Sequence, residues 1–253
     1  MVFFLLGFFN LAIASESADF ACEVMGFEGK VERETPEGVR SLLKEGDLLK
    51  EGDVIEVASG ASADISYDKD WNNIIRLEEG TKTKISSIYP AKVNVKEGGV
   101  FVKLKRLPTG STFEVQTPTA IAAVRGTEYR TTVTNGETQV FNFSSSVVQV
   151  YGVDAVGAPS GEPVLLTQSQ KTNIETVGKK PSPPLLMSLS DTEKGKSIQS
   201  SLDEKVKQVV ESGRTGKIQD ISALESGKAR SETKKPDGES RVNDARRRQF
   251  KSN

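Results

Sequence analysis

Short segments in which apolar and polar residues strictly alternate constrain the fold of this chain more than any other feature. In residues 61–68, ASADISYD, the apolar side chains fall on one face and the serines and aspartates on the other. This is the period of a half-buried strand. Similar short runs recur at 54–57, 74–77, 93–95, 100–104, 113–115, 129–133, 139–143 and 147–151. Turn signals such as Asn135-Gly136 separate them, so the sequence predicts an all-β fold: an antiparallel sandwich, a roll or a short β-solenoid of short strands.

The composition changes after this β-domain, which we place at residues 22–175. Residues 176–196 include GKKPSPPLL, whose prolines predict an extended linker. Apolar residues at helical spacing then predict an amphipathic helix over residues 197–212: Ile198, Leu202, Val206, Val209 and Val210. The polar, charge-mixed residues 213–253 are expected to form a disordered basic tail.

The N-terminus reads as an export signal. An apolar run from Val2 to Ile13 ends in Ala12-Ile13-Ala14, a pattern that signal peptidase favours, so residues 1–14 are predicted to be a signal peptide. The run is shorter than the about 20 residues of a membrane span, so no integral span is expected. We therefore expect an exported protein in the periplasm, with the cell surface or secretion as alternatives. Cys22 is interpreted as a buried hydrophobe on the first strand, with lipidation as the alternative.

Composition limits the chemistry that this chain can perform. The 253 residues include 0 His and 1 Cys, which excludes His-based nucleophile systems, His-ligated metals and intrachain disulfides. Residues 179–253 carry 17 basic and 11 acidic residues, a net charge of +6, whereas residues 1–178 carry 17 and 24, a net charge of −7. We predict no enzyme, no cofactor and no nucleic-acid partner.

The stretch TPTAIAAVRGTEYRTTV, residues 117–133, is the most distinctive in the chain. Pro118 lacks an N–H and restricts Thr117 to extended geometry, so the chain is expected to leave the sheet there. Gly126 permits a positive φ that re-aims the chain into the strand beginning at Glu128. We expect Arg125 to clamp a carboxylate or free carbonyls at this corner, with recognition of a partner's carboxylate as the alternative. The motif Thr117, Pro118, Arg125, Gly126 and Thr127 is thus predicted to be structural.

Together with LKEGDLLKEGDVIEVASGASADISYD, IIRLEEGTKTKI and VNVKEGGVFVKL, this stretch resembles the FecR-like domain of the ferric-citrate sensor family over residues 24–151. The resemblance implies a periplasmic, all-β domain that receives a signal from an outer-membrane receptor and relays it to a sigma factor. No cytosolic anti-sigma segment precedes the apolar run, so the anti-sigma arm is expected to be absent. We predict a non-catalytic module of envelope signalling that docks an envelope protein, with a receptor signalling domain as a candidate partner. The alternative is a structural cell-wall or surface module that binds peptidoglycan or another glycan.

Three further candidate sites follow from spacing and composition. Trp71 lies at an expected hairpin tip, where it could anchor a partner or fold back over its own hairpin. The basic residues Arg246, Arg247 and Arg248 could engage an acidic partner or an anionic surface, or could be a solvated terminus. Calcium-loop spacing is matched by Asp68, Asp70, Asn72 and Glu79, but the flanks alternate as strands, so no metal is predicted.

Overall fold

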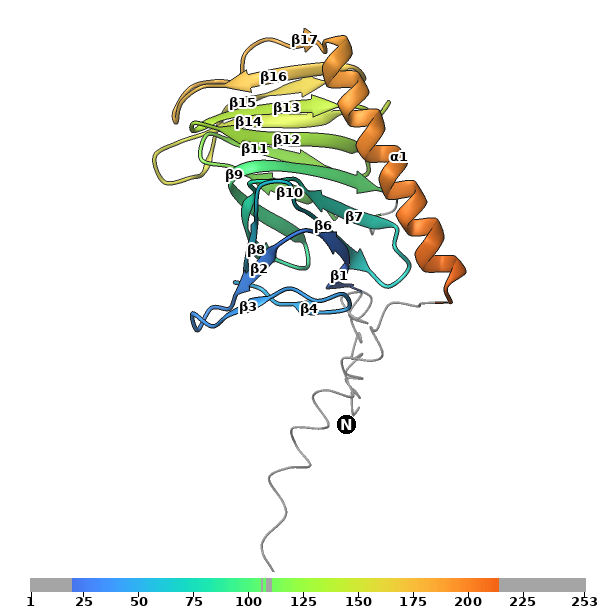
Figure 1. The fold of residues 1–253 in the computed structure, drawn as a ribbon. Coiled ribbons are helices and arrows are strands. Elements are labelled where there is room, and N and C mark those ends of the chain that lie inside the picture. Colours follow the sequence, from blue (N-terminus) through green and yellow to red (C-terminus); the bar gives the residue numbers. More distant parts are fainter. Residues whose placement is uncertain (1–19, 106, 108–110, 214–253) are drawn as a thin grey trace, which may run out of the picture. The chain divides into compact units, whose positions relative to one another are not determined.

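Two β-sheets packed face to face and one long helix make up the described part of the chain, which in the computed structural model is residues 20–105, 107 and 111–213 (Figure 1). Sheet A contains, in spatial order, β4 (Leu48–Leu49), β1 (Phe20–Glu28), β6 (Ser62–Asp68), β7 (Asn73–Leu77), the second half of β9 (Ala91–Leu104), β12 (Glu128–Thr134), β13 (Glu137–Asn142), β16 (Gln170–Ile174) and β17 (Leu185–Leu186). Sheet B contains β3 (Arg40–Leu42), β2 (Val31–Glu34), β5 (Val54–Val57), β8 (Lys82–Ser87), the first half of β9, β10 (Phe113–Gln116), β11 (Ala120–Val124), β14 (Val148–Val153) and β15 (Pro159–Leu166). The all-β prediction is confirmed, and the sheets are open at their edges.

Strand β9 belongs to both sheets and joins them. Its first half pairs with β8 and β10 in sheet B, and its second half pairs with β7 and β12 in sheet A. Gly98 lies at the crossing with a φ of 87°, and a Cβ there would lie 2.4 Å from the Thr81 Cα, so the position requires glycine. The β9–β10 pairing is parallel, whereas every other strand pairing in the described residues is antiparallel.

Apolar side chains from both sheets fill the space between them. The Tyr67 and Phe113 rings meet edge to face, with centroids 5.1 Å apart, a favoured aromatic geometry. Cys22 lies in this core on β1 and is fully buried, as expected for a small hydrophobe. Burial is the main cause that raises the pKa of the Cys22 thiol to about 12, which makes the thiol unreactive at neutral pH.

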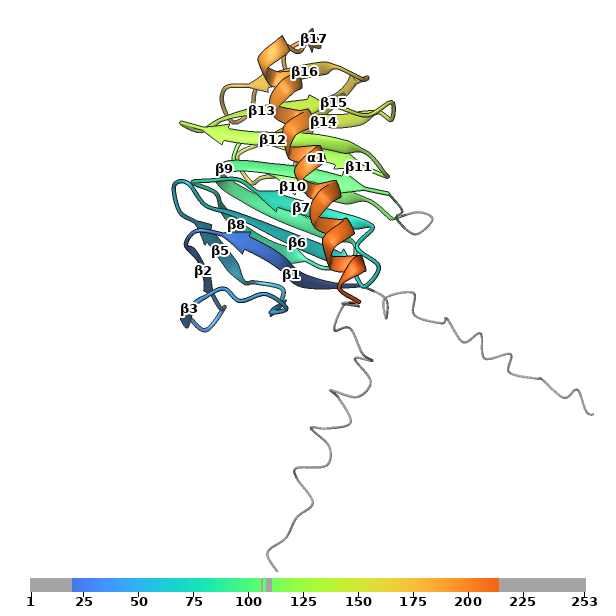
Figure 2. The ribbon, with the colours of Figure 1, turned by 45° about the vertical axis from the view of Figure 1, so that its right-hand side comes forward.

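Helix α1 (Leu189–Glu211) crosses the outer face of sheet A, from its β17 end towards its β1 end (Figures 1 and 2). Ser188 caps the helix through a reciprocal capping box with Asp191, which satisfies two backbone N–H groups that the first turn leaves free. The prediction began this helix at residue 197, but it begins eight residues earlier, at Leu189. The expected linker over residues 176–196 is correspondingly shorter and includes β17, which pairs with β16.

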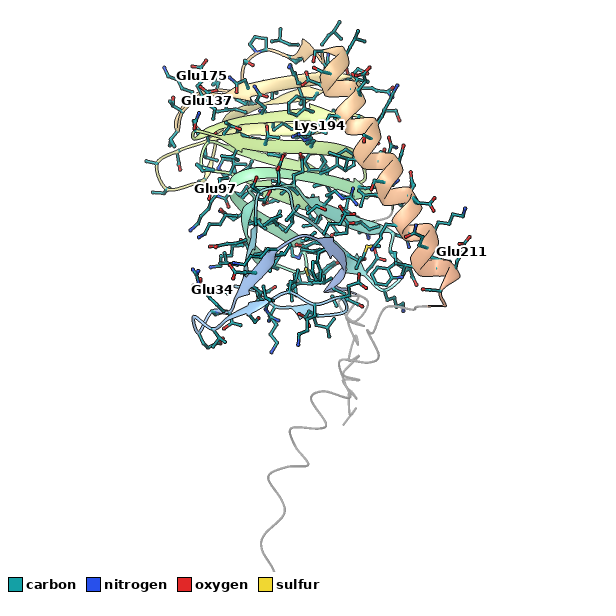
Figure 3. The ribbon with its side chains drawn as sticks, viewed as in Figure 1. Glu34, Glu97, Glu137, Glu175, Lys194 and Glu211 are labelled. Carbon is teal, nitrogen blue, oxygen red and sulfur yellow. The ribbon has the colours of Figure 1, made fainter. Side chains whose placement is uncertain are left out.

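The helix is held by an apolar seam flanked by ion pairs. Its buried residues recur every seven positions, at Gly195, Leu202 and Val209. A second apolar cluster lies between helix and sheet, formed by Met25, Trp71, Ile74, Phe101, Leu202 and Val209, with Phe143, Ile198 and Val206 packed against it. Ion pairs join the helix to the sheet and its loops: Asp203 with Lys103, Lys194 with Glu78, Asp191 with Lys171, and Lys205 with Glu45. Figure 3 shows Lys194 on the helix, with Glu97, Glu137 and Glu175 along the side of the sandwich away from it.

The predicted signal peptide, residues 1–14, and the basic residues Arg246, Arg247 and Arg248 lie outside the described residues. Among the described residues, no helix is both long and apolar enough to cross a membrane.

Candidate functional site

The motif of residues 117–127 connects the two sheets. Strand β11 ends at Val124 in sheet B, and β12 begins at Glu128 in sheet A, so Arg125, Gly126 and Thr127 form the corner between them. Gly126 has a φ of 151°, and a Cβ built on it would meet nothing within 4 Å. The glycine is therefore required by the backbone and not by crowding. The corner has the geometry expected from the sequence.

Thr117 and Pro118 lie at the tip of the β10–β11 hairpin. The Thr117 hydroxyl accepts a hydrogen bond from the Ala120 N–H at 2.9 Å and lies 2.7 Å from the Thr138 hydroxyl. Thr119 lies 2.7 Å from the same Thr138 hydroxyl. These three threonines are buried, so their hydroxyl groups satisfy one another inside the sandwich. The expectation that the chain leaves the sheet here is wrong: Thr117 and Pro118 form a tight turn that returns the chain to sheet B as β11.

Arg125 does not form the clamp that the sequence predicted. Its side chain is exposed, and within the described ranges it has no ion pair or hydrogen bond to another residue. The guanidinium therefore lies at the surface of the corner, without an ion pair to any carboxylate of the described residues. The alternative use of Arg125, recognition of a group outside this domain, is the one that the geometry leaves available.

A pocket of about 430 Å³ adjoins the corner. Its walls come from the corner itself and from the start of β14, which the Ala123–Gln149 pairing brings alongside β11. The residues lining it are Thr112, Ala123, Val124, Arg125, Gly126, Thr127, Ser146, Val147 and Gln149. The Thr127 hydroxyl is buried and has no hydrogen-bond partner among the described residues. The sequence alone does not indicate Ser146, Val147 and Gln149, because only strand pairing places them beside Arg125.

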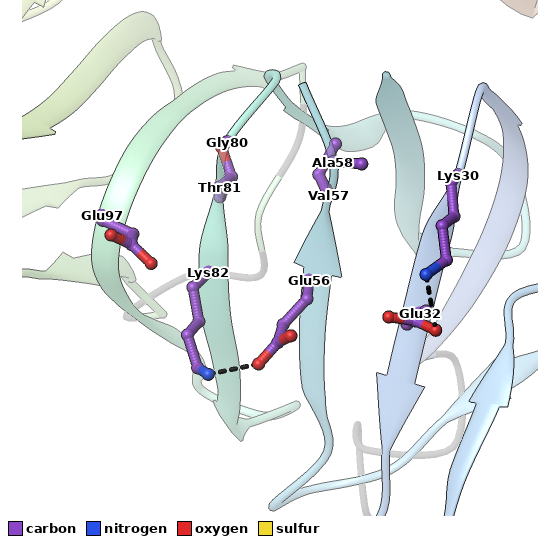
Figure 4. Close-up of a pocket in the computed structure, with 9 residues that line it drawn as sticks. All are labelled: Lys30, Glu32, Glu56, Val57, Ala58, Gly80, Thr81, Lys82 and Glu97. Carbon is purple, nitrogen blue, oxygen red and sulfur yellow. Dashed lines mark hydrogen bonds and ion pairs between the residues drawn. The ribbon is translucent and has the colours of Figure 1, made fainter. Parts of the chain in front are cut away.

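A second pocket, of about 300 Å³, lies on the outer face of sheet B across β2, β5, β8 and β9 (Figure 4). Its charged side chains largely pair within it: Lys30 with Glu32 at 3.1 Å, and Lys82 with Glu56. The hydrogen bond from Lys82 is the main cause that lowers the pKa of Glu56. General acid catalysis at neutral pH needs a carboxyl pKa shifted upward, so this pocket is poorly suited to acid–base chemistry.

The calcium-type spacing does not produce a metal site. Asp68 ends β6, and Asp70 and Asn72 lie in the β6–β7 loop, whereas Glu79 lies beyond the other end of β7. The Asp68 Oδ1 already accepts the N–H groups of Asp70 and Asn72, at 2.9 and 3.0 Å. Residues 20–105, 107 and 111–213 contain no group of three or more acidic, His or Cys side chains that could hold a metal ion. The strands that flank this loop separate the residues that an EF-hand would bring together.

Trp71 lies at the predicted hairpin tip, but its indole points inward. It has a φ of 56° and is 3% exposed, in the apolar cluster beneath α1. Of the two alternatives for Trp71, the structure therefore favours an inward-facing ring, since the apolar residues of the helix bury it. Trp71 stabilises the contact between helix and sheet.

Residues 53–148 match the family model described as FecR protein. Two crystal structures of a "putative anti-sigma factor" from Parabacteroides distasonis ATCC 8503, at 1.65 and 2.50 Å resolution, are similar to this chain with a TM-score of 0.44 and 15% sequence identity. The match covers 55% of this chain and 62% of each of those chains, so this chain spans less than two thirds of their length. No curated protein matches the sequence.

Proposed function

Because residues 53–148 form a FecR domain, we propose that this chain is a non-catalytic protein-binding module of envelope signalling, exported to the periplasm, that docks an envelope protein. The family implies regulation of signalling, and a receptor signalling domain is the kind of partner that fits it. The proposed docking face is the outer face of sheet B.

The two outer faces of the sandwich differ, and this difference carries the proposal. Helix α1 covers sheet A, whereas no helix in the described part of the chain covers sheet B. Side chains of sheet B that point away from the core form a polar row across the strands at Lys84, Asn94 and Gln116. In a second row, Ala123 lies between the polar residues Glu114 and Gln149. A polar, rigid sheet face with small pockets is suited to a protein partner.

Glycan binding is the weaker candidate function. Sugar-binding surfaces use exposed aromatic rings to stack against sugars, and the single Trp is buried beneath α1. The outer face of sheet B does carry Tyr151, whose hydroxyl donates to the Gln149 side chain at 3.2 Å. One such ring makes a poor platform for an extended glycan.

Photo-crosslinking in cells tests the proposal face by face. The residue p-benzoylphenylalanine would replace Lys84 or Gln149 on sheet B, and Lys196 or Ser200 on the exposed side of α1 as matched controls. We expect a defined envelope protein to crosslink from the sheet B positions and not from the helix positions. Equal crosslinking from the helix, or recovery of glycan fragments from sheet B, would overturn the proposal.

A further inference from the structure

The pocket at the β11–β12 corner combines a free cation with a buried, unpaired hydroxyl. Arg125 is exposed and has no partner within the described ranges, and the Thr127 hydroxyl is buried with none. The Thr127 hydroxyl is one of several buried side-chain atoms without a hydrogen-bond partner in the described residues, so the unpaired guanidinium of Arg125 is the feature that indicates a ligand here. The two residues come from one corner, on either side of Gly126.

The charge of the lining selects an anion. Arg125 is the only charged residue among the nine that line the pocket, and no acidic side chain lies among them. The other polar groups are neutral side chains that can donate hydrogen bonds, among them Thr127, Ser146 and Gln149. A single guanidinium with neutral donors balances one negative charge, and its planar fork matches a carboxylate in a two-pronged hydrogen-bonded pair.

The shape of the pocket suits an amino-acid side chain presented by a protein. Val124 and Val147 contribute apolar wall, and Val147 is 44% exposed. Methylene groups can pack there while a terminal carboxylate reaches Arg125. Open space over Gly126 leaves room for the backbone of an incoming segment to approach.

We propose that the Arg125–Thr127 pocket binds a glutamate or aspartate side chain of a protein partner. Arg125 pairs with the carboxylate, and neutral lining side chains such as Ser146 and Gln149 donate hydrogen bonds to it. This inference rests on the proposed function, since it names the chemistry by which a docked partner is recognised. It assigns to Arg125 the role of a specificity residue and not that of a fold-stabilising clamp.

The test uses NMR on the full mature chain and a pair of peptides that differ in one group. The amide of Gly126 and the Nε–H of Arg125 are followed during titration with acetyl-Ser-Gly-Glu-Gly-Ser-amide, and with the same peptide carrying Gln in place of Glu. We expect saturable shifts of both signals with the Glu peptide at millimolar concentration and weakening by about tenfold or more with the Gln peptide. Indistinguishable responses to the two peptides, or no response to the Glu peptide, would overturn the inference. A stronger response to inorganic phosphate than to the Glu peptide would overturn it in favour of a phosphorylated ligand.

Two variants separate the pocket from the rest of the face. Arg125→Gln is expected to abolish the response to the Glu peptide and to keep the melting temperature, because the side chain has no partner to lose. Lys92→Gln removes the same charge from the same sheet face, where Lys92 pairs with Glu114 at 3.3 Å, and is expected to keep the response. The NMR titration does not depend on crosslinking. If the sheet B positions crosslink to an envelope protein but the pocket does not respond to the Glu peptide, only this inference is overturned. If the pocket responds to the Glu peptide but the sheet B positions crosslink to no protein, only the proposed function is overturned.

Discussion

Gly195 of helix α1 packs against the ring of Phe143 so closely that a Cβ on Gly195 would lie 2.0 Å from Phe143 Cε1. The ring is itself fixed against Phe101, with centroids 5.6 Å apart. Glycine therefore allows the first half of the helix to reach sheet A. Its low helix propensity is offset by this contact, which no larger residue could make.

Gly195→Ala is expected to weaken docking of α1. Alanine is about 1 kcal/mol more favourable than glycine inside a helix. Overpacking against Phe143 costs about 1–3 kcal/mol and outweighs this gain, because the added Cβ would lie so close to the ring. Fluorescence of Trp71, the single Trp, reports docking because the helix buries the indole. We expect the Trp71 emission of the Gly195→Ala protein to shift to the red at a lower denaturant concentration than that of the parent protein. Ser200→Ala, on the exposed side of the helix, serves as the control. If the Gly195→Ala protein is more stable than the parent and its Trp71 emission does not shift at lower denaturant concentration, the close contact with Phe143 does not limit docking of the helix.

Asp203→Ala is also expected to release the helix. Asp203 pairs with Lys103, which is 4% exposed and has Glu128 as a second partner at 3.5 Å. Losing Asp203 leaves a buried ammonium with one longer ion pair. The expected cost is about 1–2 kcal/mol, below that of breaking a fully buried pair because Asp203 is half exposed.

Denaturant unfolding of the Asp203→Ala protein at low and high salt measures this cost. Glu204→Ala, one position along the helix and exposed, is the matched control and is expected to change stability far less. High salt should reduce the difference in free energy of unfolding between the parent and Asp203→Ala, since salt screens part of the attraction between Asp203 and Lys103. Equal stability of the two alanine variants would mean that the apolar seam alone holds the helix.

Much of the sandwich could be predicted because each strand carries its own signal. The alternation in residues 61–68 predicts β6, and Gly126 predicts the corner between the sheets. Both signals depend only on residues that are neighbours in the sequence. The full helix could not be predicted from apolar spacing, because Gly195 occupies a seam position without an apolar side chain. The capping box at Ser188 and Asp191 was the available signal for its start.

Only the residues of the candidate site that lie in the corner between β11 and β12 could be predicted from the sequence. Arg125 and Gly126 are distinctive in the sequence, but Gln149 joins them through pairing between β11 and β14. That pairing is fixed by the packing of both strands over the core. The burial of Trp71 could not be decided from the sequence for the same reason: a hairpin tip is exposed only if no later element packs on it, and α1 follows more than a hundred residues later.

The Cys22 thiol is expected to resist alkylation in the native protein. Burial raises its pKa to about 12, so about one thiol in ten thousand is ionised at pH 8, and the side chain is inaccessible as well. Labelling with iodoacetamide at pH 8, followed by mass spectrometry, should show modification only in denaturant. Rapid labelling of the native protein would show that β1 opens away from the core.

Asp68→Asn is expected to stabilise the protein at neutral pH. Burial raises the pKa of Asp68 although the N–H groups of Asn72 and Asp70 favour its charged form. The folded-state pKa lies above the unfolded value, so the contribution of Asp68 to stability is fully present below the unfolded pKa and is lost as pH rises through the folded one. Asparagine keeps the oxygen that accepts the two N–H groups and removes the buried charge. The melting temperature of the variant should exceed that of the parent at pH 7, and the gap should close as pH falls below 4. Glu137→Gln, an exposed change on β13, controls for net charge and should show no gap; a variant less stable than the parent at pH 7 would show that the charged form of Asp68 supports the β6–β7 loop.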